Sequence, residues 1–173
     1  MLMPSDLTLR RATPADLLSL MTLVRAVVPL MNAAGNYQWN SDYPNEAVFS
    51  QDMAQGHLWV AEHLGAVVGV AALTQDQDPE YADADWDAAE PALVTHRLAV
   101  APSAQGLGVA QALMQHAETE ARRLGLRTLR VDTNSENAAT QRLFPKLGYR
   151  YAGEIKLVRK PGLRFFCYEK QLG

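Results

Sequence analysis

The sequence predicts an α/β fold with a mixed, partly antiparallel central sheet and helices on both faces. Three patterns indicate this fold. Short apolar stretches with strand-like alternation recur along the chain, amphipathic stretches with helical spacing separate several of them, and two strand-like stretches joined at a Pro-Gly turn end the chain. The length of 173 residues suits one domain with its own core, so we predict a single domain over residues 1–173.

The N-terminal half is predicted to begin with a strand and a helix. Residues 7–11 alternate as a short strand, and Thr13-Pro14-Ala15-Asp16 has the composition of a helix start, with Thr13 as the N-cap. An apolar face at helical spacing follows, which we expect Pro29 to end. The next predicted elements are a loop over residues 30–44, a helix over 46–55, and a hairpin of strands 58–63 and 66–74 that turns at Leu64-Gly65.

The C-terminal half alternates strands and helices. Residues 75–90 have no strong periodicity and many acidic side chains. The predicted elements after them are a strand over 92–100, a helix over 109–124, a strand over 128–132, a helix over 137–147, and strands over 149–158 and 163–171. Glycines at positions 125 and 148 are expected to end the two helices.

Composition excludes several classes of function. The net charge of −3 argues against a general nucleic-acid or membrane-surface role. Cys167 is the only cysteine, so no intrachain disulfide can form and a reducing compartment is the simpler expectation. The N-terminus shows no signal peptide, and we expect no membrane span, because no apolar run approaches the roughly 20 residues that cross a bilayer. We therefore expect a cytoplasmic protein.

The most informative stretch is Gln105-Gly106-Leu107-Gly108-Val109-Ala110, which lies between a strand stopped by Pro102 and a long amphipathic helix. A glycine turn that leads directly into a helix leaves main-chain N–H groups unpaired at the positive end of the helix dipole. Such a turn binds anions, and phosphate above all. The stretch lacks the Gly-Lys-Ser/Thr of a P-loop and the third glycine of a dinucleotide-binding fingerprint.

The segment resembles the acetyl-CoA loop of the GNAT N-acetyltransferase superfamily. The resemblance rests on Gln-x-x-Gly-x-Ala after a strand that ends Leu-Ala-Val-x-Pro, and it continues through Val131-Asp132-Thr133-Asn134, the helix that begins at Asn137, and the pair Gly148-Tyr149. The specific part covers residues 94–149. It implies a GNAT-like fold and an acetyl-CoA-dependent N-acetyltransferase with coenzyme A as co-substrate.

The resemblance also implies how the cofactor is held. The main chain of Leu98, Ala99 and Val100 would pair with the pantetheine arm like a further strand. Main-chain N–H groups of the turn would hold the pyrophosphate; its residues are Gln105, Gly106, Leu107, Gly108, Val109 and Ala110. Asn137 would contact the pantetheine arm, although a helix N-cap is the alternative role for an asparagine there.

One position departs from the family pattern. The family commonly has a tyrosine in the last helix, proposed to protonate the leaving thiolate, and the matching residue here is Phe144. Phenylalanine can pack beside the sulfur but cannot donate a proton, so we assign no general acid. An alkyl thiol has a pKa near 8.5, so its thiolate can leave without one.

His96 is the candidate general base, because it matches a place where some family members carry a catalytic glutamate. Strand alternation predicts that His96, Leu98 and Val100 share one face, and that Arg97 lies on the other as an ion-pair partner. A histidine that only hydrogen-bonds a loop is the alternative for His96. The remaining histidines lack metal-ligand spacing, so no metal site is predicted.

Two segments are candidate walls for the acceptor substrate. One is the polar, aromatic run that contains Tyr37, Trp39 and Tyr43, and the other is the acidic stretch that contains Tyr81 and Trp86. Acidic and aromatic side chains would suit a cationic amine, while a solvated acidic loop is the simpler alternative.

We therefore predict transfer of an acetyl group to a primary amine by direct attack in a ternary complex. The acceptor would be a small-molecule or peptide amine, with no nucleic-acid or membrane partner, and a homodimer is compatible with the sequence. A catalytically impaired sensor or interaction module that binds CoA is the main alternative. A nucleotide-binding regulatory domain is weaker, because the turn lacks a base-recognition or magnesium signature.

Overall fold

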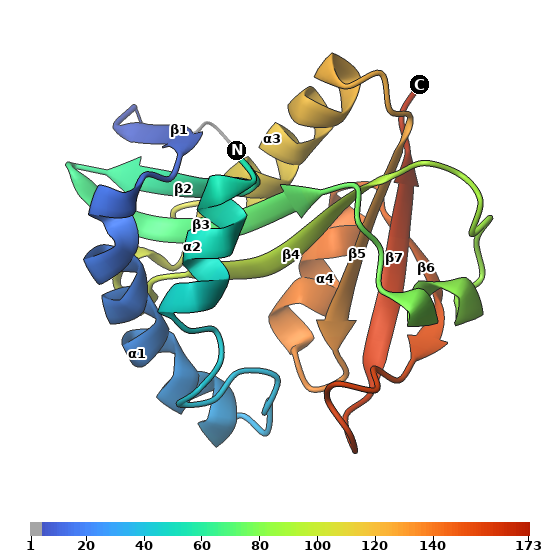
Figure 1. Cartoon of the computed structure of the whole chain (residues 1–173), viewed down its shortest axis with the longest axis horizontal. Helices are drawn as coiled ribbons and strands as arrows, with labels where there is room; N and C mark the ends of the chain where they lie inside the picture. Colours follow the sequence, from blue (N-terminus) through green and yellow to red (C-terminus); the bar gives the residue numbers. More distant parts are fainter. Residues whose placement is uncertain (1–4) are drawn as a thin grey trace.

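The computed structural model describes residues 5–173, which form one seven-stranded sheet in the order β1-β2-β3-β4-β5-β7-β6 (Figure 1). The strands are β1 (Leu7–Arg11), β2 (Leu58–His63), β3 (Ala66–Thr74), β4 (Leu93–Val100), β5 (Thr128–Asn134), β6 (Arg150–Ile155) and β7 (Phe165–Gln171). Only β4 and β5 run parallel to each other. The mixed, partly antiparallel sheet predicted from the sequence is confirmed.

Helices cover both faces of this sheet, as predicted. They are α1 (Leu17–Ala33), α2 (Glu46–Ala54), α3 (Val109–Arg123) and α4 (Ala138–Lys146). Helices α1 and α2 pack together with the apolar side chains of one face of the sheet. Helix α3 packs on the opposite face, and the buried Phe144 of α4 joins the same cluster as Met114 and Ala117 of α3. Three short 3-10 turns, Pro14–Asp16, Pro79–Asp83 and Pro102–Ala104, complete the elements.

Helix α1 begins as predicted but does not end at Pro29. The Asp16 carboxylate accepts a hydrogen bond from the Thr13 N–H at 2.8 Å, which fixes the 3-10 turn that leads into the helix. The helix continues to Ala33, since a proline late in a helix removes only one N–H donor and the apolar face beyond it still packs.

Helix α1 also corrects the expectation about membrane spans. Within the described residues, Pro14–Ala33 has the length and the mean hydropathy, 1.5, of a candidate span. The structure packs one side of this segment into the core, through Leu20, Leu23, Val24 and Val27. A core helix meets the same test of length and composition, so this is weak evidence for a membrane segment.

The acidic stretch after β3 is attached to the sheet by a buried cation. Arg130 of β5 is fully buried, and its Nε donates to Glu169 of β7 at 2.9 Å. Its remaining donors reach the Gln77 side chain and the Asp87 carbonyl, and its guanidinium stacks on the Trp86 ring at 4.6 Å. Residues 77–87 pack over one face of the sheet, through Tyr81 and Ala84, and supply the partners that the buried Arg130 requires.

Arg130→Met should therefore destabilise the protein by about 3–5 kcal/mol, because Glu169 would keep a buried charge with one fewer partner. Arg122→Met is the matched control: Arg122 is exposed and pairs with Glu118 at 3.7 Å, so its loss should cost about 0–1 kcal/mol. Urea unfolding of both variants measures the difference. Equal midpoints for the two variants would show that the buried pair contributes no more than a surface one.

Candidate active site

The centre of the molecule is an opening between β4 and β5. The two strands pair from Leu93↔Leu129 to Thr95↔Val131, and no pair follows. Beyond this point β5 stays paired with β7, while β4 stays paired with β3. The edge of β4 from His96 to Val100 therefore faces a gap where a neighbouring strand would otherwise lie, and its main-chain groups are available to a ligand.

A β-bulge reshapes β4 within this opening. Val70 pairs with Ala99 and Ala72 with His96, so Arg97 and Leu98 together oppose the single residue Ala71. Arg97 has a φ of +53°, in the left-handed region that L-residues rarely adopt. Its guanidinium donates to both Asp52 carboxylate oxygens at 2.7 Å, so the predicted ion-pair role of Arg97 is confirmed.

The bulge overturns the predicted strand alternation. Leu98 and Val100 pack toward α3, whereas His96 lies near the Tyr81 ring, on the side of the sheet covered by the 3-10 turn of Pro79–Asp83. His96 therefore does not share a face with Leu98 and Val100. An extra residue inverts the alternation of every side chain after it, and the sequence carries no signal for a bulge at an arginine.

The glycine turn lies at the N-terminus of α3, as predicted. Gly106 and Gly108 have φ values of +83° and +76°, and Gly108 is the N-cap of the helix. Within residues 5–173, no main-chain carbonyl accepts a hydrogen bond from the N–H groups of Gly106, Gly108, Val109 or Ala110. A glycine N-cap has no side chain to satisfy them, so these donors are available to an anion.

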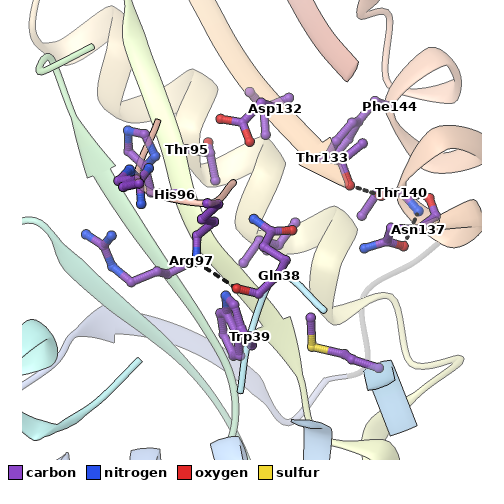
Figure 2. A pocket seen from close by; sticks show the side chains of 15 residues that line it. Gln38, Trp39, Thr95, His96, Arg97, Asp132, Thr133, Asn137, Thr140 and Phe144 are labelled. Carbon is purple, nitrogen blue, oxygen red and sulfur yellow. Dashed lines mark hydrogen bonds between the residues drawn. The ribbon is translucent and has the colours of Figure 1, made fainter. Parts of the chain in front are cut away.

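Three adjoining pockets run from this turn through the opening between the strands. The pocket at the turn is lined by residues that include Val100, Gln105, Asn137 and Ala138. It shares Met31 and Asn137 with a central pocket of about 590 Å³, mouth included, which lies where β4 and β5 part (Figure 2). The central pocket shares Gln38, Arg159 and Lys160 with an outer pocket that also contains Tyr37 and Tyr43.

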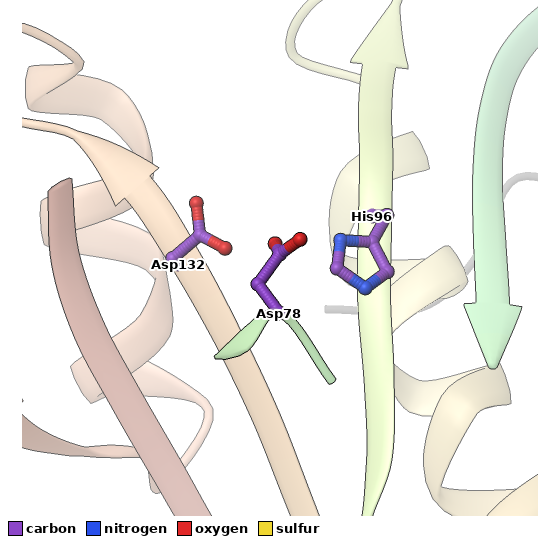
Figure 3. A group of neighbouring side chains, drawn as sticks. All are labelled: Asp78, His96 and Asp132. Carbon is purple, nitrogen blue, oxygen red and sulfur yellow. The ribbon is translucent and has the colours of Figure 1, made fainter. Parts of the chain in front are cut away.

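His96 and Asp132 line the central pocket and form a cluster of titratable groups with Asp78, which lies beside it. Ligand atoms of Asp78, His96 and Asp132 all lie within 4.8 Å of one another, and Asp78 lies between the other two (Figure 3). Burial lowers the pKa of the His96 imidazole, against the raising effect of the Asp132 charge. Burial raises the pKa of the Asp132 carboxyl, while His96 and the Tyr81 hydroxyl oppose this shift. Burial therefore favours the neutral form of the His96 imidazole, which is the form that can accept a proton.

These groups already have protein partners. Asp78 accepts a hydrogen bond from Arg159 at 2.9 Å, and Asp132 accepts one from the Tyr81 hydroxyl. One His and two carboxylates could together ligate a divalent cation, because each hydrogen bond leaves the second oxygen of its carboxylate open. The same groups could also transfer a proton.

The wall of the central pocket on the α4 side is built from hydroxyl groups and one aromatic ring. The Asn137 side chain accepts the Thr140 N–H at 3.2 Å, which caps α4, and Asn137 also lines two of the pockets. The Thr140 hydroxyl lies 2.6 Å from that of Thr133. A dashed line marks this hydrogen bond in Figure 2. Phe144 is buried against Tyr149 and Tyr168 and presents its ring to the same pocket.

The five aromatic residues predicted to contact an acceptor separate into two groups. Trp39 lines the central pocket, and Tyr37 and Tyr43 line the outer one. Tyr81 and Trp86 line neither: Tyr81 is buried, and the Trp86 indole N–H donates to the Tyr81 carbonyl at 2.7 Å. The structure uses these two residues to hold the acidic stretch and to orient Asp132.

The profile of the Acetyltransferase (GNAT) family matches residues 24–149, which is well over half of the chain. The chain belongs to this family. A 5-NmdU N-acetyltransferase of Pseudomonas phage PaMx11 is 28% identical over 143 residues, a span that covers 78% of this chain and 91% of the relative. Residues 24–149, which the family profile matches, include β4, β5, the glycine turn and α4.

Solved structures share the fold of this GNAT domain over nearly all of its length. A GNAT-family acetyltransferase from Streptococcus agalactiae 2603 is similar, with a TM-score of 0.85 at 26% identity, over 98% of this chain and 97% of that one. YncA from Salmonella typhimurium, solved with its cofactor acetyl-CoA, has a TM-score of 0.70 at 24% identity and covers 98% of this chain and 95% of its own.

Sequence reasoning missed several residues of the central pocket. Asp132 and Thr133 were visible only as part of the resemblance, and Arg159 and Lys160 only as turn residues before Pro161-Gly162. Arg159 and Lys160 lie in the connection between β6 and β7, which folds against the pocket. No local pattern in the sequence indicates this placement.

If His96 is the base, turnover at saturating substrate should rise with pH through an apparent pKa below 6.5, because only the neutral imidazole accepts a proton. His96→Ala should lower turnover by roughly 100-fold or more and remove that dependence. His116→Ala is the matched control, because burial also lowers the pKa of His116 but its ring packs against Trp59 outside the three pockets. An unchanged pH–rate profile in His96→Ala would assign the proton to another acceptor.

Proposed function

We propose that this GNAT protein transfers the acetyl group of acetyl-CoA to a primary amine by direct attack within a ternary complex. One observation carries the proposal: the pocket at the glycine turn and the outer pocket meet in a central pocket that contains His96. The first pocket suits a phosphorylated cofactor, the outer pocket suits an acceptor, and the group between them can accept a proton. An enzyme that joins two substrates directly needs this arrangement.

The cofactor is expected to lie along β4 and over the glycine turn. Its pyrophosphate would accept hydrogen bonds from the free N–H groups of Gly106, Gly108, Val109 and Ala110, next to the positive end of the α3 dipole. The pantetheine arm would pair with the free edge of β4 at Leu98 and Val100, opposite Asn137 of α4. YncA, which shares the fold, was solved with acetyl-CoA, and this supports the choice of cofactor.

The reaction is a substitution at the thioester carbonyl. The neutral amine attacks the carbonyl carbon, the carbon–sulfur bond breaks with its electron pair left on sulfur, and the proton lost by nitrogen passes to His96, directly or through water. Main-chain N–H groups on the edge of β4 that β5 leaves unpaired beyond Thr95 can polarise the carbonyl oxygen. Phe144 excludes water beside the sulfur, and no protein acid is required because CoA thiolate is a tolerable leaving group.

The relative named as a 5-NmdU N-acetyltransferase supports N-acetylation as the reaction type. A sensor that binds acetyl-CoA without turnover is the alternative, favoured by the missing tyrosine at position 144. The neutral His96 in the central pocket favours catalysis. Release of CoA in the presence of an amine panel separates the two functions.

Acetyl-CoA should raise the melting temperature of the protein, and at 100 times its dissociation constant it should add about 2.7 kcal/mol of stability. Gly108→Val should abolish this gain, because a side chain at the N-cap would occupy the space that the pyrophosphate needs. A thermal-shift titration with acetyl-CoA measures both effects.

Gly65→Val controls for backbone strain. Gly65 has a φ of +80° in the β2–β3 turn, close to the +76° of Gly108, but it lies outside the glycine turn. The Gly65→Val variant should be less stable than the unmodified protein but should keep the full gain in stability from acetyl-CoA. A full gain in Gly108→Val, or none in the unmodified protein, would contradict the cofactor site.

A further inference from the structure

Lys160 is a cation without an acidic partner at the boundary between the central and outer pockets. Its Nζ donates to the Gln38 carbonyl at 2.7 Å and lies 3.9 Å from the centre of the Tyr43 ring. No carboxylate of residues 5–173 forms an ion pair with it. A half-buried ammonium held only by a carbonyl and a ring has lost part of its hydration without gaining a counter-charge.

The surroundings of Lys160 add to this positive charge. Arg159, the preceding residue, uses one Nη to bind Asp78 and is half exposed, so further N–H groups of its guanidinium can bind another anion. The Arg97 guanidinium also reaches the Tyr43 hydroxyl, at 3.2 Å. Burial, and next the Arg159 charge, lower the pKa of Lys160 to about 8. The ammonium form, which predominates near pH 7, is therefore destabilised where it lies.

The deep end of the same pocket, at His96, has the opposite character. Asp132 lines it, and Asp78 lies within 4.8 Å of both residues but already binds Arg159. An ammonium approaching His96 would be attracted chiefly to Asp132 before it loses its proton. The pocket is thus negative where the amine must react and positive at its outer boundary.

We infer that the acceptor is a small zwitterionic amine, whose amino group reaches His96 and whose anionic group, a carboxylate or a phosphoryl group, binds Lys160 and Arg159. An anion there would supply the missing counter-charge and form charge-assisted hydrogen bonds with both side chains. A simple cationic amine would satisfy only the deep end. This inference rests on the proposed acetyl transfer and narrows its acceptor class.

The acidic stretch does not form the acceptor wall that the sequence suggested. Asp78 is engaged by Arg159, Glu80 accepts the Val158 N–H at 2.9 Å, and Glu90 accepts the Thr128 hydroxyl. Asp83 and Asp85 are exposed and line none of the three pockets. Asp78 and Glu80 hold the β6–β7 connection in place, and that connection brings Arg159 and Lys160 to the pocket.

The test compares acceptors matched in length: an amino acid, the corresponding aminoalkyl phosphonate, and the alkylamine that lacks an anionic group. For the unmodified protein, kcat/KM should be highest for one of the two zwitterions, which identifies the anion. Lys160→Met should raise KM for that acceptor by roughly 10- to 100-fold and leave kcat nearly unchanged. The alkylamine should be unaffected, and Lys160→Arg should recover most of the loss.

Lys156→Met is the matched control, because Lys156 is an exposed lysine near the same connection and lines none of the pockets. It should keep the KM of the unmodified protein for every acceptor. Titration calorimetry of each zwitterion into the CoA-bound protein gives a readout that does not depend on turnover.

The outcomes distinguish this inference from the proposed function. If the alkylamine is the best acceptor, or if Lys160→Met raises KM equally for all three, acetyl transfer stands and the anion site is overturned. Absence of zwitterion binding to the CoA-bound protein overturns the anion site as well. Zwitterion binding that depends on Lys160, without acetylation of any amine, supports the anion site and overturns the proposed function.

Discussion

The geometry of the molecule depends on the early end of pairing between β4 and β5. Parallel neighbours would normally stay hydrogen-bonded along their length, but here pairing ends at Thr95↔Val131, just before the β4 bulge, while β5 stays paired with β7 to Asn134. The glycine turn follows β4 and α4 follows β5, so both flanks of the opening carry polar groups from strand ends. The fold thus creates the site without a large hollow in the core.

The elements with strong local signals were predictable from the sequence. The β2–β3 hairpin turns at Leu64-Gly65, α3 begins after Gly108, and Asn137 caps α4, because each depends on the conformational preference of a few neighbouring residues. The glycine turn indicated an anion site for the same reason. A resemblance over residues 94–149 then predicted the family that the comparisons confirm.

The features that sequence reasoning missed depend on contacts between distant segments. Arg97 enters the left-handed region because Asp52 of α2 and Tyr43 hold its side chain, and neither is near it in sequence. The acidic stretch was predicted as a candidate wall, but the positions of its partners Arg130, Arg150 and Arg159 follow from the sheet order. Net charge and local composition report neither which charges pair nor which remain unpaired.

The ion pair between Arg97 and Asp52 also stabilises a strained backbone conformation. A non-glycine residue with φ near +53° stores about 1–3 kcal/mol of backbone strain, and a bidentate ion pair to α2 is what holds it. Helix α2 thereby holds β4 in its bent conformation, although α2 lines none of the three pockets. A substitution that weakens the packing of α2 would change the curvature of β4 and, through it, the position of His96. Substitutions far from the substrates can therefore alter the reaction rate without changing any reacting group.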